Sequence, residues 1–320
     1  MSQPSRITFV TANLFNFVAP PDAYYDFENI YSLEQWQDKL AWTQRQIEKL
    51  EADVIGLQEV FSIEQTRAFF STFGYPPYFA TVDTPPHVED EYIYSSPVVA
   101  IASRFPIEKV QAVEFDLATL EPFGVNVAPE FSRKPIYAQV IHPVLGHIAV
   151  YVTHLKSQRP ADSEQPETSS TIIGRWLSTQ QRGWEAAMLR DAMQKRYRKE
   201  PMPTVLMGDM NQPITPTSVN SALVSNTGDS VTELQLKDGW SLQSDALKDE
   251  RPPATHYHFS TGNVLDYILL SQEFDTLSDI SVAEVVDYQV SNQHLINPIY
   301  DRDKNASDHA FVALTAEVEL

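Results

Sequence analysis

Cysteine is absent from the 320-residue sequence, which excludes disulfide bonds, thiolate metal sites and cysteine nucleophiles. A chain without thiols persists in either redox compartment, so this absence is compatible with the cytoplasm without establishing it. No apolar run approaches the roughly 20 residues that a membrane-spanning helix needs. The N-terminus has no basic segment followed by a longer apolar stretch. We therefore expect no signal peptide, no membrane span and a cytoplasmic location.

Positive charge is scarce as well. The chain has 23 Lys and Arg residues against 43 Asp and Glu residues, which gives a formal net charge of -20. Proteins that bind long nucleic acids usually carry a basic surface, because neutralised phosphates supply most of the affinity. An acidic surface is common in soluble proteins of any function. In this chain the negative net charge favours a substrate that is a small phosphate ester, or one that is bound only locally, over an extended nucleic-acid duplex.

The apolar patterns predict one α/β domain that covers residues 1–320. Steps of three and four between apolar residues indicate an amphipathic helix at 33–50, and polar residues indicate a long loop at 156–174. No repeat, low-complexity tract or linker divides the chain. Further helices are expected at 64–73 and 176–197, and strands at 7–14, 52–60, 78–82, 97–103, 110–115, 135–142, 148–153, 205–208, 263–271, 280–287 and 310–318.

The most informative stretch is the apolar run at 205–208, which ends at Gly208 and is followed by Asp209 and Asn211. Residues two apart in an extended segment point to the same side, so Asp209 and Asn211 can face one cavity. An acid that orients water beside an amide that donates and accepts suits the hydrolysis of a charged ester. Turn chemistry of Asp and Asn explains the same residues equally well.

Other predicted strands also end in polar residues, namely Asn13, Glu59, His154 and the pair Asp308–His309. Asp266 lies inside a run that is otherwise apolar, where an acid is costly unless it is paired. Its simplest partner is His309. Each residue also has a plainer explanation: Glu59 as an exposed strand end, His154 as a buried histidine with satisfied hydrogen bonds, and Asp308 as part of a turn.

Together these residues suit phosphoester hydrolysis, which needs a cation, a positioned water and donors for the phosphoryl oxygens. Glu59 and Asp308 offer the hard oxygen ligands of Mg²⁺ or Mn²⁺, whereas zinc fits less well because no cysteine or tight histidine cluster is present. Asp209 can orient water, and an Asp266–His309 pair would favour the charged imidazole. The remaining candidates for contact with phosphate are Asn13, His154 and Asn211.

Several motifs resemble those of the endonuclease/exonuclease/phosphatase superfamily, whose fold is DNase I-like. They occur in the family's order and span nearly the whole chain. Asn13 is similar to its first-strand asparagine. The remaining motifs are Gln58-Glu59, Arg133-Lys134-Pro135, Thr153-His154, Gly208-Asp209-Met210-Asn211, Leu265-Asp266-Tyr267-Ile268-Leu269 and Ser307-Asp308-His309.

The resemblance implies a four-layer α/β sandwich, in which two facing, mainly antiparallel sheets are flanked by helices. It also implies a metal-dependent site at the sheet edge, with Mg²⁺ or Mn²⁺ held by Glu59, Asn13 and Asp308. Asp209 then orients or deprotonates the attacking water, and Asn211 helps to hold it. His154 and His309 stabilise the phosphoryl transition state, with Asp266 behind His309.

The chain differs from many nuclease members of the family at residue 15, and it carries three cations that are candidates for phosphate binding. Nuclease members often carry an acid two residues after the first asparagine, where this chain has Phe15. We expect Arg133, Lys156 and Arg159 to bind phosphate, although charges in a solvated loop would explain Lys156 and Arg159 equally well.

We therefore expect a divalent-metal-dependent phosphodiesterase, with nuclease activity as the first candidate. The alternative within enzymes is a phosphatase or phosphodiesterase that acts on a small molecule, lipid head group or nucleotide, which the acidic charge favours. A non-catalytic module that binds a phosphate ligand is a third possibility, and a structural role is a fourth. The presence of six polar candidates together argues against the binding module, and a structural role would leave Asp266 inside an apolar run without a reason. No obligate protein partner is inferred.

Overall fold

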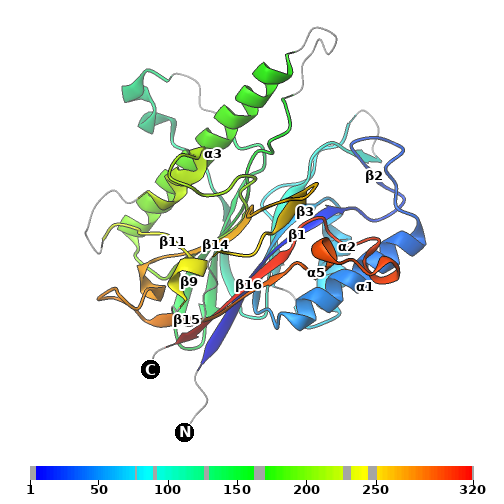
Figure 1. The fold of residues 1–320 in the computed structure, drawn as a ribbon. Coiled ribbons are helices and arrows are strands. Elements are labelled where there is room, and N and C mark those ends of the chain that lie inside the picture. Colours follow the sequence, from blue (N-terminus) through cyan, green and yellow to red (C-terminus); the bar gives the residue numbers. More distant parts are fainter. Residues whose placement is uncertain are drawn as a thin grey trace.

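A computed structural model describes residues 5–75, 78–88, 92–125, 130–161, 170–225, 232–243 and 251–318. Two six-stranded sheets form its centre, and the long helices lie outside them (Figure 1). Both sheets are mainly antiparallel, with a parallel pair in each. In the described part of the chain, no helix is both long enough and apolar enough to cross a membrane.

The first sheet has the order β15-β16-β1-β3-β6-β4, and its first and last long strands in the chain, β1 and β16, pair directly. The second sheet has the order β11-β14-β10-β9-β8-β7. The strands of the first sheet are β1 (Arg6–Phe17), β3 (Val54–Val60), β4 (Phe79–Ala80), β6 (Val98–Ser103), β15 (Ala283–Ser291) and β16 (Phe311–Val318). Those of the second are β7 (Ile107–Ala112), β8 (Ile136–His142), β9 (Gly146–His154), β10 (Thr204–Asp209), β11 (Lys237–Asp238) and β14 (Asp266–Leu270).

The helices and two short strand pairs complete the chain. The strand pairs are β2 (Ala23–Tyr24) with β5 (Ile93–Tyr94), and β12 (His256–His258) with β13 (Thr261–Asn263). The α-helices are α1 (Leu33–Lys49), α2 (Ile63–Ser71), α3 (Thr171–Lys199), α4 (Gly239–Leu242), α5 (Gln293–Ile296) and α6 (Tyr300–Asp303). The 3-10 helices are η1 (Leu117–Thr119), η2 (Glu121–Phe123), η4 (Val219–Val224) and η5 (Gln272–Phe274).

Three apolar clusters separate four layers, as the sandwich prediction requires. Phe9 of β1 and Met207 of β10 belong to the cluster between the two sheets. Their neighbours Val10 and Leu206 face outward, towards α1 and α2 in one case and α3 in the other. Because successive strand residues point to opposite faces and both faces are covered, these strands are apolar at nearly every position. The four-layer sandwich that the family resemblance implies is confirmed.

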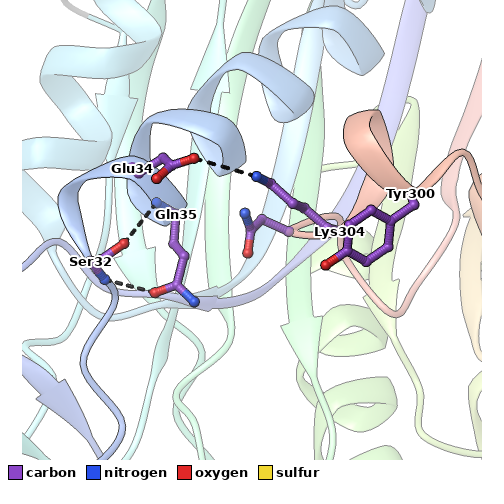
Figure 2. A pocket seen from close by; sticks show the side chains of 6 residues that line it. Ser32, Glu34, Gln35, Tyr300 and Lys304 are labelled. Carbon is purple, nitrogen blue, oxygen red and sulfur yellow. Dashed lines mark hydrogen bonds and ion pairs between the residues drawn. The ribbon is translucent and has the colours of Figure 1, made fainter.

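The start of α1 is fixed by reciprocal hydrogen bonds. The Ser32 hydroxyl accepts the Gln35 backbone N–H at 3.2 Å, and the Gln35 side chain accepts the Ser32 N–H at 2.8 Å. Lys304, next to α6, forms ion pairs with Glu34 at 3.6 Å and Asp38 at 3.0 Å. Ser32, Glu34, Gln35 and Lys304 line a surface pocket (Figure 2). The capping box therefore determines where α1 begins and how its first turn is oriented.

Some element boundaries differ from the sequence prediction. Helix α3 begins at Thr171 rather than near residue 176, because the Ser170 side chain caps it by accepting the Ile173 N–H. Strand β7 covers Ile107–Ala112, three residues earlier than expected. Asp266 is the first residue of β14 and not an interior one, so this acid lies at the sheet edge. Residues 162–169 of the expected long loop lie outside the described part of the chain.

Gly208 allows β9 and β10 to approach at the end of the second sheet. It is opposite Thr153 in the parallel register, and a Cβ at Gly208 would lie 1.9 Å from the Thr153 carbonyl oxygen. Its φ of +154° is also one that other residues rarely adopt. The absence of a side chain here therefore brings the next pair in register, Asp209 and His154, side by side.

We predict that Gly208→Ala lowers the free energy of unfolding by about 3 kcal/mol or more, because the backbone must shift to relieve the clash. Gly146→Ala is the control, because Gly146 has a φ of +71° with no atom near its missing Cβ; strain alone should cost about 1 kcal/mol there. Urea denaturation of both variants measures the difference. Equal losses would show that the approach of β9 and β10 imposes no steric limit.

Candidate active site

Polar side chains from both sheets meet at one edge, where four strands end and one begins. Asn13 is near the end of β1, Glu59 near the end of β3, His154 ends β9 and Asp209 ends β10, while Asp266 begins β14. The register places Asp209 opposite both His154 and Asp266. Strand pairing therefore brings His154, Asp209 and Asp266 together, and the packing of the two sheets adds Asn13 and Glu59.

Asp209 is the centre of this cluster and is 1% exposed. Its Oδ2 accepts a hydrogen bond from Asn13 Nδ2 at 3.1 Å and lies 3.4 Å from His154 Nε2 and 3.8 Å from His309 Nε2. Its Oδ1 accepts the Asn211 backbone N–H at 2.7 Å. Burial raises the pKa of Asp209 to about 7, although the charge of His309 opposes this shift. The carboxyl can therefore exchange a proton near neutral pH.

His309 connects two carboxylates. Its Nδ1 lies 2.9 Å from Asp266 Oδ2, and its Nε2 faces Asp209. Burial by itself lowers the pKa of His309, but the charges of Asp266 and Asp209 outweigh it and raise that pKa well above its usual value. The structure therefore brings together the acid and the histidine that the sequence analysis paired, and it favours the charged imidazolium.

His154 has the opposite electrostatic character. It is 3% exposed, and burial, followed by the charges of Arg133 and His309, lowers its pKa well below the usual value. Its Nδ1 is buried without a hydrogen-bond partner among the described residues. A neutral imidazole beside a charged one gives the site two different hydrogen-bonding groups.

Glu59 is held in place by a turn with positive φ angles. Its own φ is +62°, and its Oε2 accepts the Asn16 backbone N–H at 2.8 Å. Asn13 Nδ2 lies 3.4 Å from the other carboxylate oxygen. Ser307 donates a hydrogen bond to the Asn13 carbonyl at 2.7 Å and accepts the His309 N–H at 3.0 Å. Ser307 therefore holds Asn13, whose amide faces the Glu59 carboxylate.

The oxygen donors of the site fit a hard divalent cation. The charges of Glu59 and Asp308 both raise the pKa of Lys39 and that of Tyr31. Carboxylate and amide oxygens are the ligands that Mg²⁺ and Mn²⁺ prefer. Within the described ranges, two groups of three residues are also close enough to hold a metal ion: His256, Asp308 and His309, and the buried group Asp209, Asp266 and His309. In the buried group, His309 is already hydrogen-bonded to Asp266, which suits proton transfer better than ligation.

Of the three cations predicted to bind phosphate, two arginines lie near each other and the lysine is not placed beside them. Arg133 lies near His154, whose pKa it lowers, and its Nη1 donates to the Leu155 carbonyl at 3.4 Å. Arg133 and Arg159 both lower the pKa of Tyr25, which burial and then Glu59 raise. Among described residues neither arginine forms an ion pair with a carboxylate. For Lys156, no contact within those residues places the side chain beside them.

Three residues near the site were missed by the sequence analysis: Tyr25, Lys39 and His256. The His256 ring lies 4.8 Å from that of His309. Lys39 is 1% exposed, and burial lowers its pKa to about 8, opposed by the charges of Asp308 and Glu59. A lysine three residues after Trp36, on the apolar face of a predicted helix, was a signal for Lys39. Tyr25 and His256 follow no pattern that would have identified them.

Helix α3 positions the two loops that carry the cations. Glu185 is buried, and its carboxylate accepts the backbone N–H of Ser132 at 2.7 Å and that of Lys156 at 2.6 Å. Arg182 donates to the Lys156 and Ser157 carbonyls at 3.1 and 3.3 Å. Charged hydrogen bonds of this kind are strong when buried. The polar residues buried on α3 therefore fix the segments next to Arg133 and Arg159.

We predict that Glu185→Ala destabilises the protein by about 2–4 kcal/mol, because two backbone N–H groups lose their acceptor. Hydrogen exchange of the Ser132 and Lys156 amides should accelerate while the central strands stay protected. Asp191→Ala, a carboxylate on the same helix in a surface ion pair with Lys195, is the control and should change stability by less than about 1 kcal/mol. Unchanged exchange at both amides would contradict the positioning role.

We also predict a pH-dependent stability difference at Asp209. Its folded-state pKa, about 7, lies above the ordinary value of 3.8, so its stabilising contribution is complete below pH 3.8 and is lost as pH rises through 7. Asp209→Asn, which stays neutral, should therefore gain at least about 1 kcal/mol relative to wild type between pH 4 and 8 in EDTA.

Urea titrations at several pH values measure this difference. Asp301→Asn, at an exposed carboxylate of α6, is the control and should follow wild type throughout. A stability difference between Asp209→Asn and wild type that is constant from pH 4 to 8 would show that burial does not raise this pKa.

Known proteins share both the sequence family and the fold. Residues 10–309 match the endonuclease/exonuclease/phosphatase family, whereas no curated protein matches the sequence. The human nocturnin catalytic domain with bound sulfate is 18% identical, with a TM-score of 0.59, 98% of this chain covered and 95% of that one.

Two further solved structures have the same fold. An AP endonuclease from Archaeoglobus fulgidus is 15% identical, with a TM-score of 0.56 and 98% and 100% coverage of the two chains. An endonuclease/exonuclease/phosphatase from Beutenbergia cavernae is 18% identical, with a TM-score of 0.57 and 98% and 72% coverage. The match over nearly the whole chain, together with this fold, places the protein in the endonuclease/exonuclease/phosphatase family, whose name describes phosphoester hydrolases.

Proposed function

We propose that the protein is a divalent-metal-dependent phosphoester hydrolase, in the first instance a phosphodiesterase with nuclease activity. The observation that carries this proposal is the buried Asp209 carboxyl, held by Asn13 and placed between His154 and His309. Such a group next to the Glu59 carboxylate combines a base for water with a ligand for a cation. Family membership supports the same class of reaction.

A bound Mg²⁺ or Mn²⁺ would neutralise charge on the phosphoryl group and the leaving oxygen. Glu59 is proposed as its main ligand, with Asn13 and Asp308 beside it. The two Glu59 carboxylate oxygens are held at different positions, since Oε2 accepts the Asn16 N–H and Oε1 faces the Asn13 amide. This restraint supports a ligand that is oriented before the metal binds.

Asp209 is proposed to orient and deprotonate the attacking water. Its Oδ1 is fixed by the Asn211 backbone N–H, which leaves Oδ2 as the oxygen that faces the other site residues. A pKa of about 7 is well matched to a base at neutral pH. The Asn211 side chain donates to the Leu155 carbonyl at 2.9 Å, so in this arrangement Asn211 orients the Asp209 loop. Its contact with water or phosphate stays a prediction.

The two histidines are proposed to donate hydrogen bonds to the phosphoryl oxygens. Asp266 holds the Nδ1 side of His309 at 2.9 Å, which leaves the Nε2 proton of a charged imidazolium available to an anion. His154, kept neutral by burial, can donate one proton without adding a second positive charge. Arg133 and Arg159, with Lys156 as a weaker candidate, are proposed to hold a phosphate further along the substrate.

A small-molecule phosphoesterase is the second candidate, because the net charge of -20 opposes binding of a long polyanion. Structures with the same fold are compatible with a nuclease and with a small-molecule phosphoesterase. One is an AP endonuclease, and another is the nocturnin catalytic domain with a bound sulfate anion.

A substrate panel tests the proposal and separates the two candidates. Purified protein with Mg²⁺ or Mn²⁺ is assayed on bis-p-nitrophenyl phosphate, p-nitrophenyl phosphate, supercoiled plasmid and a phospholipid head-group diester, with Glu59→Ala in parallel. Cleavage of plasmid and diester that depends on Glu59 supports a nuclease, and turnover confined to small esters supports the second candidate. Absence of Glu59-dependent turnover on every substrate would favour a non-catalytic binding module.

The assigned roles predict the effect of variants and of chelation. His309→Ala and Asp209→Asn should each reduce kcat by about 100-fold or more, and EDTA should abolish activity until Mg²⁺ or Mn²⁺ is added. His147→Ala, an exposed histidine of β9 paired with Glu108, is the control and should retain full activity. Full activity in EDTA would exclude a metal from the reaction. Full activity in either site variant would exclude the role assigned to that residue.

A further inference from the structure

Tyr25 is an exposed aromatic residue whose backbone adopts a conformation that residues other than glycine rarely take. It follows β2 directly, its φ is +63°, and it is 44% exposed. A bulky residue at positive φ stores strain, which persists only where the surrounding structure imposes it. The Tyr25 N–H donates to the Tyr94 carbonyl at 2.7 Å, so the pairing of β2 with β5 imposes this conformation. Packing in a core does not explain it, because nearly half of the residue stays in contact with water.

Ring contacts connect Tyr25 to the turn that carries Glu59. The Tyr25 ring lies 5.6 Å from that of Phe61 at an interplanar angle of 84°, and 5.8 Å from that of Tyr24 at 81°. Phe61 is two residues after Glu59, a separation that an extended chain spans in about 7 Å. Among the described residues no ring lies parallel to that of Tyr25. The ring is therefore held by perpendicular neighbours close to the site, without a stacking partner of its own.

The rings behind Tyr25 are also bonded to the Asn13 turn. Tyr24 lies 5.8 Å from Tyr31, and the Tyr31 hydroxyl donates to the Phe15 carbonyl at 3.4 Å. The Phe15 backbone N–H in turn donates to the Asn13 side chain at 3.0 Å. The segment that carries Tyr25 is consequently fixed to the two strand ends that supply Asn13 and Glu59.

A cation on the other side joins Tyr25 to the predicted phosphate-binding residues. Arg133 hydrogen-bonds to the Tyr25 side chain, and its Nη1 donates at 3.4 Å to the carbonyl of Leu155, which directly follows His154. An exposed ring, a guanidinium and the histidine of β9 therefore follow one another along this edge of the sandwich. A ligand whose phosphate lies at the histidine can place an attached group against the ring.

The chemistry of this position favours a nucleobase as the attached group. Every base has a π-face that stacks on tyrosine, whereas a cationic head group such as choline, which aromatic rings also bind, would be repelled by Arg133. In a duplex both faces of a base are covered by its neighbours, so only an unstacked base can reach an aromatic side chain. The net charge of -20 disfavours a long duplex for an independent reason.

We propose that Tyr25 stacks on a base of the substrate, so that the site hydrolyses a phosphate ester of a nucleotide whose base is unstacked, in a mononucleotide or in a single strand. The inference rests on the phosphoester hydrolysis of the proposed function and adds the substrate class and the residue that selects it. Because the base is remote from the reacting phosphorus, stacking is the same in the ground state and the transition state. It therefore lowers KM without changing kcat.

The test compares two esters with the same leaving group, thymidine 5′-monophosphate p-nitrophenyl ester and methyl p-nitrophenyl phosphate. The ratio of their KM values isolates the contribution of the nucleoside. Wild type should have a KM about tenfold lower for the thymidine ester. Tyr25→Ala should raise the KM of this ester about tenfold and keep its kcat within about twofold.

Two variants serve as controls. Tyr25→Phe keeps the ring and removes the hydroxyl that is bonded to Arg133, and its KM for the thymidine ester should stay within about threefold of wild type. Tyr300→Ala removes a tyrosine of α6 that is 78% exposed, and it should match wild type on both esters. The preference of wild type for the thymidine ester is decisive by itself if Tyr25→Ala does not fold.

Equal KM values for the two esters in wild type would overturn this inference and leave the proposed function intact. An equal loss in Tyr25→Phe and Tyr25→Ala would also overturn it, because the hydroxyl would then act on the phosphate together with Arg133.

Turnover of neither ester would contradict the proposed function, and isothermal titration calorimetry with AMP and with ribose 5-phosphate then tests the stacking separately. AMP should bind about tenfold more tightly than ribose 5-phosphate. Equal affinities, or no binding of AMP, would overturn the assignment of a base to Tyr25.

Discussion

The burial of one carboxyl group, Asp209, is the constraint on which the rest of the site depends. An acid with 1% exposure is stable only if neighbouring groups compensate for lost hydration. Asn13, His154 and His309 do so from three different strands or their flanking loops. These residues lie at the same level of the sandwich, so the register of both sheets at this edge allows the carboxyl group to be buried.

The strands were predictable because they are covered on both faces, which leaves unbroken apolar runs in the sequence, whereas the four-layer arrangement followed from the resemblance of the motifs to a known family. The positions of Asp209 and Asp266 were also accessible, since polar residues that interrupt such runs stand out. The exact place of Asp266 was not, because pairing with β10 begins only at Asp266, so this residue begins β14 instead of lying within it. Element boundaries of this kind depend on tertiary pairing, which a local pattern does not contain.

The residues that sequence analysis missed have a common physical reason. Lys39, Tyr25 and His256 acquire their roles from neighbours far away in the chain: Lys39 from Glu59 and Asp308, Tyr25 from Arg133 and Arg159, and His256 from the His309 ring. Helix α3 presents the converse case. Its buried Arg182 and Glu185 look like surface charges in the sequence, yet they bind backbone groups of loops and make the helix part of the framework of the site.

The hydrogen bond from Ser307 to the Asn13 carbonyl joins residues 294 positions apart, and β1 pairs with the C-terminal strand β16. Since chains are synthesised from the N-terminus and contacts distant in sequence form late, Asn13 and Glu59 emerge long before the residues that complete the cluster around them. During synthesis the early acids are therefore exposed without His309, and the machinery for chemistry comes into existence only with the last strand. A chain that ends before His309 lacks both the strand that joins β15 to β1 and the histidine that completes the cluster around Asp209.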